Sequence, residues 1–135
     1  LLDERLTAQT FDQALLGDVL KKHATGGEFV CAEPAVDQPR VEAFEVSSAG
    51  PMFGPEMTAS TEGVHAAEEA VLTKNRLDFD CWKNGGKLTL GARRHYRVVL
   101  QDPAFTALNP STVELAFALP AGSYASVVVD ELLKP

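Results

Sequence analysis

The chain has 135 residues, 45% of them apolar and 23% charged, which fits one globular domain that buries roughly two thirds of the surface of its unfolded form. This composition excludes a disordered chain. The net charge of -7 excludes a protein that holds nucleic acid by overall charge, because that affinity comes from neutralising phosphates with lysine and arginine. The first six residues form neither a signal sequence nor a membrane span, so we expect a cytoplasmic protein with no membrane segment.

The cysteines and histidines are not spaced as metal ligands. Cys31 and Cys81 lie far apart, and His23, His65 and His95 are equally scattered. A zinc site needs such residues in closely spaced pairs, for example one helical turn apart. We therefore predict two free thiols and no metal site.

The first elements are short. Leu2 and Leu6 lie one helical turn apart, which predicts the last turns of a helix that begins before Leu1. Apolar residues then predict two strands, over residues 19–23 and 28–31, joined by a turn that contains Gly26 and Gly27. Glycine at this turn favours a hairpin.

The middle of the chain is marked by Gly-Pro pairs. An acidic segment between Pro34 and Pro39 can hold at most a turn or two of helix. The alternation around Phe44 and Val46 predicts a half-buried strand. This strand enters residues 50–55, where two Gly-Pro pairs force the backbone out of regular structure twice and fix a loop against the core.

A helix is predicted from Glu62 onward, because apolar residues recur at positions 64, 67, 71 and 72. Glu68 and Glu69 lie beside this apolar face. We interpret them as solvated helix charges, with a catalytic pair of carboxylates as the alternative.

The last third of the chain contains both strand and helix patterns. Alternation around Asn84-Gly85-Gly86 suggests a hairpin, but Trp82 breaks it, so the structure of residues 77–90 stays open. Alternating residues predict a strand over residues 96–100 and a clearer one over residues 113–119, central to a sheet. Residues 125–132 have helical spacing. The whole indicates a mixed, largely antiparallel α+β fold with few helices.

Positive charge is concentrated in two segments despite the acidic total. Lys21, Lys22 and His23 form the first, and residues 93–97, Arg-Arg-His-Tyr-Arg, form the second. Each segment fits either a solvated strand end or a local contact with phosphate groups.

Four short stretches carry a family resemblance through their order and spacing. They are Gly17-Asp-Val-Leu-Lys-Lys22, Gly50-Pro-Met-Phe-Gly54, Gly91-Ala-Arg-Arg94 and Leu119-Pro-Ala-Gly-Ser-Tyr-Ala125. Together they resemble the TruD family of tRNA pseudouridine synthases over nearly all of the chain. One departure is Asp130, where the family's C-terminal tail typically has arginine.

The resemblance implies isomerisation of a uridine in tRNA to pseudouridine, without a cofactor, by one aspartate in a cleft. Such chemistry needs a carboxylate beside the glycosidic bond and a base that is flipped out of its stack. The family's catalytic aspartate belongs to the N-terminal half, and nothing in this sequence matches it. No catalytic residue is therefore assigned in this chain, and whether it is itself an enzyme stays open.

The resemblance also implies an organisation and a set of contacts. Residues 1–112 would form the inserted domain beside the RNA cleft, and residues 113–135 would be a strand and helix that pack on the catalytic domain. The implied partners are tRNA and either the missing catalytic half or another copy that covers the C-terminal helix. Gly50, Pro51 and Gly54 would form the structural loop. The RNA-binding candidates are Lys21, Lys22, Arg93, Arg94, Arg97 and Tyr124, with a core position as the alternative for Tyr124.

Two hypotheses follow, and a third lacks support. The chain is the C-terminal portion of a tRNA pseudouridine synthase, or it is a catalytically inactive module of that family that binds RNA or assembles a ribonucleoprotein. An unrelated small enzyme would need a catalytic constellation that the sequence does not show. An exposed apolar face on the helix over residues 125–132 would favour the first hypothesis, because a missing half would cover it.

Overall fold

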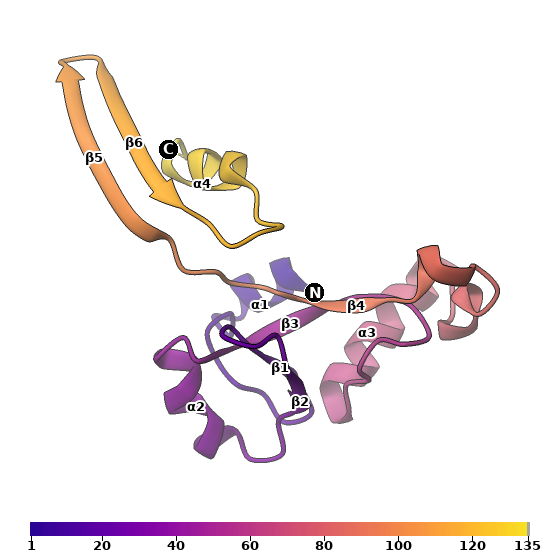
Figure 1. The fold of residues 1–135 in the computed structure, drawn as a ribbon. Helices are drawn as coiled ribbons and strands as arrows, with labels where there is room; N and C mark the ends of the chain where they lie inside the picture. The colour runs from indigo at the N-terminus through magenta and orange to yellow at the C-terminus, as the bar shows by residue number, and fades with distance from the viewer. Residues whose placement is uncertain (135) are drawn as a thin grey trace. The chain divides into compact units, whose positions relative to one another are not determined.

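The computed structural model describes residues 1–134 and divides the chain into two compact units. The first unit is Leu1–Arg97, and the second begins at Val98. The first contains a four-stranded antiparallel sheet, and the second a two-stranded one (Figure 1). The predicted α+β class with antiparallel sheets and few helices is therefore confirmed.

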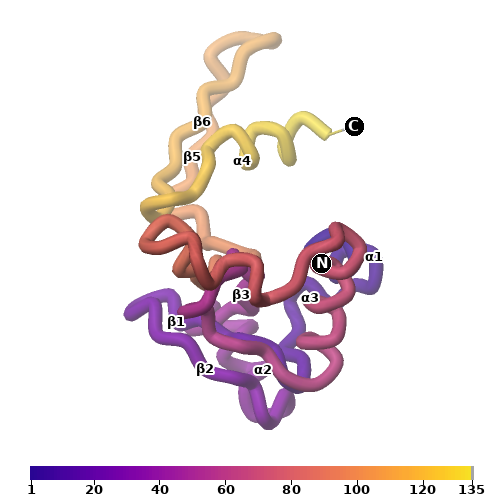
Figure 2. Tube along the Cα trace, turned by 90° about the vertical axis from the view of Figure 1, so that its right-hand side faces the viewer, coloured from indigo at the N-terminus to yellow at the C-terminus, as the bar shows by residue number. Residues whose placement is uncertain are grey.

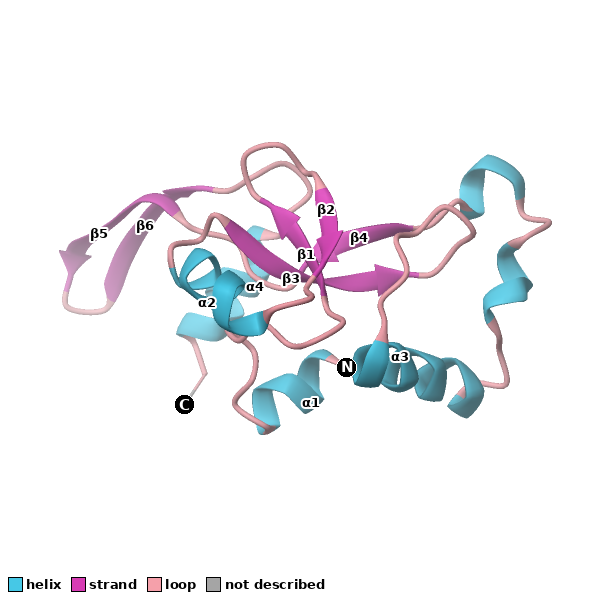
Figure 3. Ribbon diagram, turned by 90° about the horizontal axis from the view of Figure 1, so that it is seen from below, coloured by secondary structure: helices cyan, strands magenta, loops and turns pink. Residues whose placement is uncertain are grey.

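The sheet of the first unit has the strand order β2-β1-β3-β4 (Figure 3). Its strands are β1 (Val19–Lys22), β2 (Glu28–Val30), β3 (Val46–Met52) and β4 (Ala92–His95). The predicted hairpin of β1 and β2 is confirmed (Figure 2). Leu20 lies opposite Phe29 in it. Because β3 lies between β1 and β4, strands from the beginning and the end of this unit come together around it.

The core of the first unit lies between this sheet and α2 (Pro34–Glu42). Its buried members are Ala14, Leu20, Cys31, Val41 and Val46. The expectation of at most a turn or two of helix here was too short, because α2 has nine residues. Proline is well suited to the first helical position, which Pro34 occupies. The side-chain Oε1 of Gln38 also accepts a hydrogen bond from the backbone of Ala14 at 2.9 Å, which fixes the helix to the preceding loop.

The first Gly-Pro pair does not interrupt the strand, so that expectation was wrong. β3 continues through Gly50 and Pro51 to Met52, with Gly50 opposite Arg94 in β4. β1 pairs with β3 only as far as Ser48, so the strand has a free edge at Pro51. Proline lacks a backbone N–H and is tolerated at such an edge.

The glycines of this region allow close packing. A side chain at Gly50 would place its Cβ 2.5 Å from Cε1 of Tyr96. A side chain at Gly54 would place its Cβ 2.3 Å from the backbone nitrogen of Gly91, itself at a φ of +83°. The chain therefore does leave regular structure at Gly54, against the backbone that leads into β4.

The helix predicted from Glu62 onward is confirmed in α3 (Glu62–Lys74). A helix is also present at Leu2 and Leu6, as α1 (Leu2–Thr7), although it begins at Leu2 and not before Leu1. Residues 77–90, left open by the sequence, form two short 3₁₀ helices, η1 (Phe79–Trp82) and η2 (Gly86–Thr89). The side chain of Asp78 accepts a hydrogen bond from the backbone of Asp80, which starts η1. Trp82, which breaks the alternation, stacks on Phe53 with a centroid distance of 5.6 Å.

The second unit consists of a hairpin and a helix. The hairpin pairs β5 (Gln101–Asn109) with β6 (Thr112–Ala118), and the helix is α4 (Ala125–Leu132). The strand and helix predicted over residues 113–119 and 125–132 are confirmed. Two details were wrong: β6 belongs to a two-stranded sheet in this chain, and residues 96–100 lie between β4 and β5. None of the described helices combines the length and the hydropathy needed to cross a membrane.

Candidate nucleic-acid interface

The two basic segments of the sequence meet on either side of β3. The ring of His23, just after β1, stacks on that of His95 in β4, with a centroid distance of 4.3 Å and an interplanar angle of 13°. Nε2 of His95 lies 3.2 Å from the backbone oxygen of Lys21. Nζ of Lys21 in turn donates to the backbone oxygen of Arg93 at 2.8 Å. Segments that are more than seventy positions apart therefore form one local site.

Arg93, one of the predicted phosphate contacts, is enclosed in the protein. Its side chain is 0% exposed and forms a buried ion pair with Glu68 of α3. Nη1 and Nη2 donate to the two carboxylate oxygens at 2.5 and 3.0 Å, and Nε donates to the backbone oxygen of Thr58 at 2.8 Å. The guanidinium is therefore directed inward, and its function here is to join β4 to α3.

Glu68 corrects a second expectation, that it is a solvated helix charge. Its carboxylate is buried, and it also accepts a hydrogen bond from the hydroxyl of Ser60 at 2.7 Å. Its neighbour Glu69 is exposed, as expected. The sequence signal that could have found the pair is weak, because nothing local distinguishes Glu68 from Glu69.

Lys21 is half-buried and already has a carboxylate partner. Its Nζ lies 2.8 Å from Oε1 of Glu28, whose other oxygen accepts a hydrogen bond from Thr58 at 2.6 Å. Burial raises the pKa of Glu28, but the hydrogen bonds from Lys21 and Thr58 outweigh it and hold that pKa below its usual value. A carboxylate that stays charged neutralises part of the Lys21 charge.

Lys22 and Arg94 are the exposed members of the two basic segments. Successive residues of a strand point to opposite faces of the sheet. The side chain of Lys22 is therefore on the other face from that of Lys21, and the side chain of Arg94 is on the other face from that of Arg93. Among the hydrogen bonds and ion pairs within residues 1–134, none involves the ammonium of Lys22. These two side chains are the best placed of the candidates to meet a ligand from solution.

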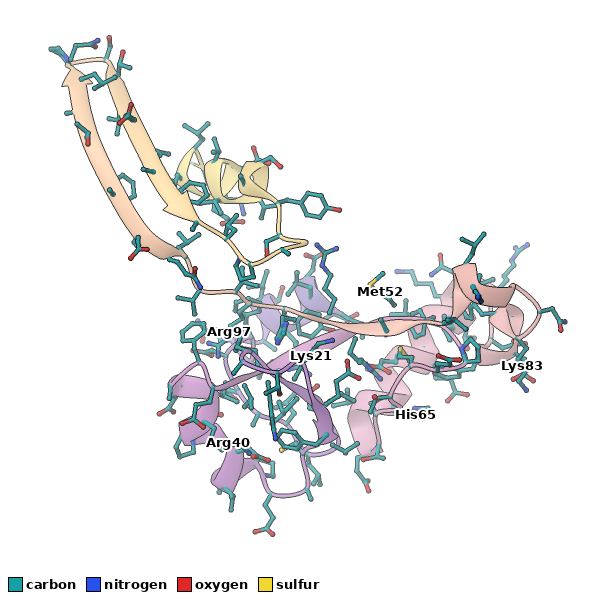
Figure 4. The ribbon with its side chains drawn as sticks, viewed as in Figure 1. Lys21, Arg40, Met52, His65, Lys83 and Arg97 are labelled. Carbon is teal, nitrogen blue, oxygen red and sulfur yellow. The ribbon has the colours of Figure 1, made fainter. Side chains whose placement is uncertain are left out.

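Arg97, which is labelled in Figure 4, lies between an aromatic ring and a backbone carbonyl. Its guanidinium carbon lies 4.3 Å from the centroid of Phe44, and Nη2 donates to the backbone oxygen of Val41 at 2.7 Å. Burial lowers the pKa of Arg97, while Asp12 acts in the opposite direction. Arginine remains charged under any physiological condition, so Arg97 contributes a fixed positive charge beside His23.

Histidines at this site were not predicted as functional residues. Nε2 of His23 lies 2.8 Å from the hydroxyl of Ser47. Burial is the largest cause that lowers the pKa of both imidazoles. The charge of Arg97 lowers the pKa of His23 further, and the charge of His23 lowers that of His95 further. Both rings are therefore neutral at pH 7. The available signal was that each basic segment of the sequence contains one histidine.

Tyr124 belongs to the second unit, at the residue before α4, and is 63% exposed. Within the described residues, Tyr124 therefore does not occupy a core position. Gly50 and Gly54 have the packing function given above, but Gly50 and Pro51 lie within β3, and only Gly54 lies in a loop. Among residues 1–134, no cluster of histidine, cysteine and carboxylate side chains is arranged to hold a metal ion.

The fold and this site define an α+β domain with a local basic surface, the chemistry that a protein uses to contact nucleic-acid phosphates. The chain belongs to the TruD family, since the family model for tRNA pseudouridine synthase D (TruD) matches residues 1–132. The family resemblance of the four sequence stretches is confirmed.

Relatives of known name cover almost all of the chain. It is 44% identical over 133 residues to the tRNA pseudouridine synthase D of Anaeromyxobacter sp. (strain Fw109-5), which covers 98% of this chain and 38% of that protein. It is 39% identical over 136 residues to the tRNA pseudouridine synthase D of Geobacter sulfurreducens, covering 99% of this chain and 32% of that protein. The chain thus spans about a third of the length of these relatives.

A solved structure shares the fold. The crystal structure of the putative tRNA pseudouridine synthase D (TruD) from Methanosarcina mazei superimposes with a TM-score of 0.75 at 22% identity. The match covers 96% of this chain and 34% of that one.

Proposed function

We propose that this chain is the C-terminal portion of a tRNA pseudouridine synthase, which converts uridine to pseudouridine in tRNA in the cytoplasm. The observation that carries the proposal is the family match over residues 1–132. The chain supplies no catalytic aspartate, and the carboxylate that attacks at the glycosidic bond comes from outside residues 1–135. The chemistry needs no cofactor.

The role of this chain in the enzyme is to form a wall of the RNA cleft. Lys22 and Arg94 are exposed and basic, and Arg97 holds a positive charge beside the histidine pair. Their charge favours phosphate groups locally, although the chain as a whole carries -7. Tyr124 offers an exposed ring on which a base can stack.

The partner of the second unit is the catalytic half of the same enzyme. α4 exposes Val129 and Leu132, three positions apart on one face, by 37% and 51%, and Val127, on another side of the helix, by 55%. An exposed apolar helix face of this kind indicates a surface that another part of a protein covers. Another copy of the chain is the alternative occupant. The division into an inserted domain over residues 1–112 and a tail over residues 113–135 remains a prediction. The boundary of the two compact units of the structure instead lies between Arg97 and Val98.

The other hypothesis, an inactive module for RNA binding or ribonucleoprotein assembly, is not favoured by any observation. The intact mass of the native protein that contains residues 41–74 separates the two. A mass several times the 14.5 kDa of this chain supports the enzyme. A mass near 14.5 kDa means that no catalytic half is present and contradicts it.

The activity test uses the complete protein and transcribed tRNA. We expect new pseudouridine at a defined position, detected by mass spectrometry of nuclease digests. A variant with Lys22→Ala and Arg94→Ala should bind tRNA more weakly, with a salt dependence reduced by about one log unit per log unit of salt for each lost phosphate contact. No pseudouridine in any tRNA would contradict the proposed activity, and an unchanged salt dependence would remove both residues from the RNA surface.

A further inference from the structure

One of the two stacked histidines, His95, has a proton position that its hydrogen bond defines. A carbonyl oxygen can only accept, so Nε2 of His95, 3.2 Å from the backbone oxygen of Lys21, carries the proton. In the neutral ring, Nδ1 of His95 is then an unprotonated acceptor. Within residues 1–134, no hydrogen bond reaches Nδ1 of either ring, and neither atom is among the buried polar atoms that lack a partner. Each Nδ1 atom therefore has no hydrogen-bond partner in the described protein and keeps a hydrogen-bonding position that a ligand could use.

The surroundings of the pair are mostly cationic. Arg97 acts on His23, and Lys21 acts on His95. Glu28, on the neighbouring strand β2, is the carboxylate that favours a charged His95, and it is already paired with Lys21. Phe44 and the hydroxyl of Ser47 complete the environment of His23. A positive charge on either ring therefore lacks a free counter-ion in the protein.

A phosphate group would supply that counter-ion. It carries negative charge and accepts hydrogen bonds, so it stabilises an imidazolium that faces it. The two rings lie 4.3 Å apart, which lets one phosphate interact with both. Arg97 beside His23 and Lys21 beside His95 would keep the anion close before the proton arrives.

We propose that His23 and His95 form a phosphate contact for RNA that becomes charged only when the phosphate binds, with one proton taken from solvent onto Nδ1 of His95 or onto the unprotonated ring nitrogen of His23. No covalent bond forms or breaks in this step. The ligand class rests on the proposed function, because the phosphate is that of tRNA. The consequence is that RNA binding at this site is coupled to proton uptake.

This coupling has a definite sign. The pKa of both histidines is lowered in the free protein by burial, so both are neutral at pH 7. A bound phosphate raises the pKa of the ring that it faces. Affinity for RNA should therefore increase as the pH falls, by up to about tenfold per pH unit for one proton, between the pKa of the free state and that of the bound state.

The experiment measures tRNA binding by the complete protein between pH 6.0 and 8.0 at constant salt. Calorimetry in two buffers of different ionisation enthalpy counts the protons taken up. The variants are His23→Gln and His95→Gln, which should lose most of the pH dependence. His65→Gln is the matched control, because His65 stacks on Phe79 at 5.3 Å and lies away from Lys21 and Arg97 (Figure 4). It should keep the full pH dependence.

Equal pH dependence in the wild type and His95→Gln would overturn the proposal and leave the proposed function standing. Failure of the wild type to bind any tRNA would contradict the proposed function instead. Inorganic phosphate then decides the proposal by itself, through NMR titration of the imidazole protons of the wild type. An increase of pKa in phosphate at His23 or His95, and not at His65, supports the site, and no increase overturns it. This measurement also serves if a variant fails to fold.

Discussion

At the scale of single residues, the basic charge of this protein has two separate uses. Arg93 is turned inward and bonded through all three of its guanidinium nitrogens, while the adjacent Arg94 is exposed. Desolvating a charge is costly, and Glu68 compensates for it only as long as both partners are present. The sequence Arg-Arg thus combines a structural residue with a surface residue.

Removing one partner of the buried pair should be strongly destabilising. We expect Arg93→Ala or Glu68→Ala to lower the free energy of unfolding by about 3–5 kcal/mol, because an unpaired charge is left buried. Urea denaturation of the complete protein measures this loss. The control is Lys22→Ala, an exposed change expected to stay within about 0.5 kcal/mol. Similar losses for Lys22→Ala and Arg93→Ala would contradict a special role of the pair.

The two thiols should differ sharply in reactivity. Cys31 is 0% exposed, and burial, with Asp37 nearby, raises the pKa of its thiol to about 11. Only the thiolate reacts with alkylating reagents. We expect iodoacetamide at pH 8 to modify Cys81, which is exposed, and to leave Cys31 intact until the protein is unfolded. Mass spectrometry of the two peptides gives the result, and rapid native labelling of Cys31 would contradict its burial.

At the scale of elements, local patterns predicted what local forces determine. The hairpin of β1 and β2, α3 and α4 follow from turn glycine and apolar spacing within each segment. Residues 77–90 could not be predicted in this way. Their 3₁₀ turns depend on the Asp78 cap and on Trp82 stacking against Phe53, a residue from a distant loop.

The candidate site could be predicted only as a list of residue types. The sequence places Lys21 and Arg93 in two basic segments. It does not show that these segments lie on β1 and β4, the two strands that flank β3. Alternation along β4 determines that Arg93 points inward and Arg94 outward, and this direction depends on where α3 packs. The histidine pair exists only through that strand order.

The close contact between Gly54 and Gly91 can be tested by comparing alanine at Gly54 with alanine at Gly63, a glycine that has free space around it. Gly54→Ala forces a Cβ to within 2.3 Å of a backbone atom, so we expect a loss of several kcal/mol in the free energy of unfolding. Gly63→Ala lies in α3, with nothing within 4 Å of the new Cβ. It should stabilise the protein by about 0.5–1 kcal/mol, because alanine favours a helix. Thermal or urea denaturation tests both, and equal effects would contradict the close contact.

At the scale of the whole molecule, the two units differ in how much they bury. The first has a core around Leu20 and Val41, both at 1% exposure or less. In the second, β5 is exposed along its whole length, and Phe105 and Val113 are 64% and 57% exposed. A two-stranded hairpin is marginal by itself in water. We therefore expect the second unit to gain stability from a surface that covers it.

Leu132→Ala in the complete protein tests whether such a surface is present. If the catalytic half covers α4, the change removes a buried side chain and costs about 2–5 kcal/mol of unfolding free energy. If Leu132 stays at its 51% exposure, the cost falls to about 0.5 kcal/mol. Asp130→Ala on the same helix is the control and should be nearly neutral. Calorimetry or denaturant titration measures all three proteins, and equal values for the two variants would contradict the covering.

The buried pair of Arg93 and Glu68 also constrains how this protein can change over generations. Because either residue alone is costly without the other, a single substitution passes through a poorly stable intermediate. Replacing both by apolar residues of similar volume avoids the unpaired charge and is often close to neutral. The two positions, 25 residues apart in the chain, should therefore change together among relatives rather than one at a time.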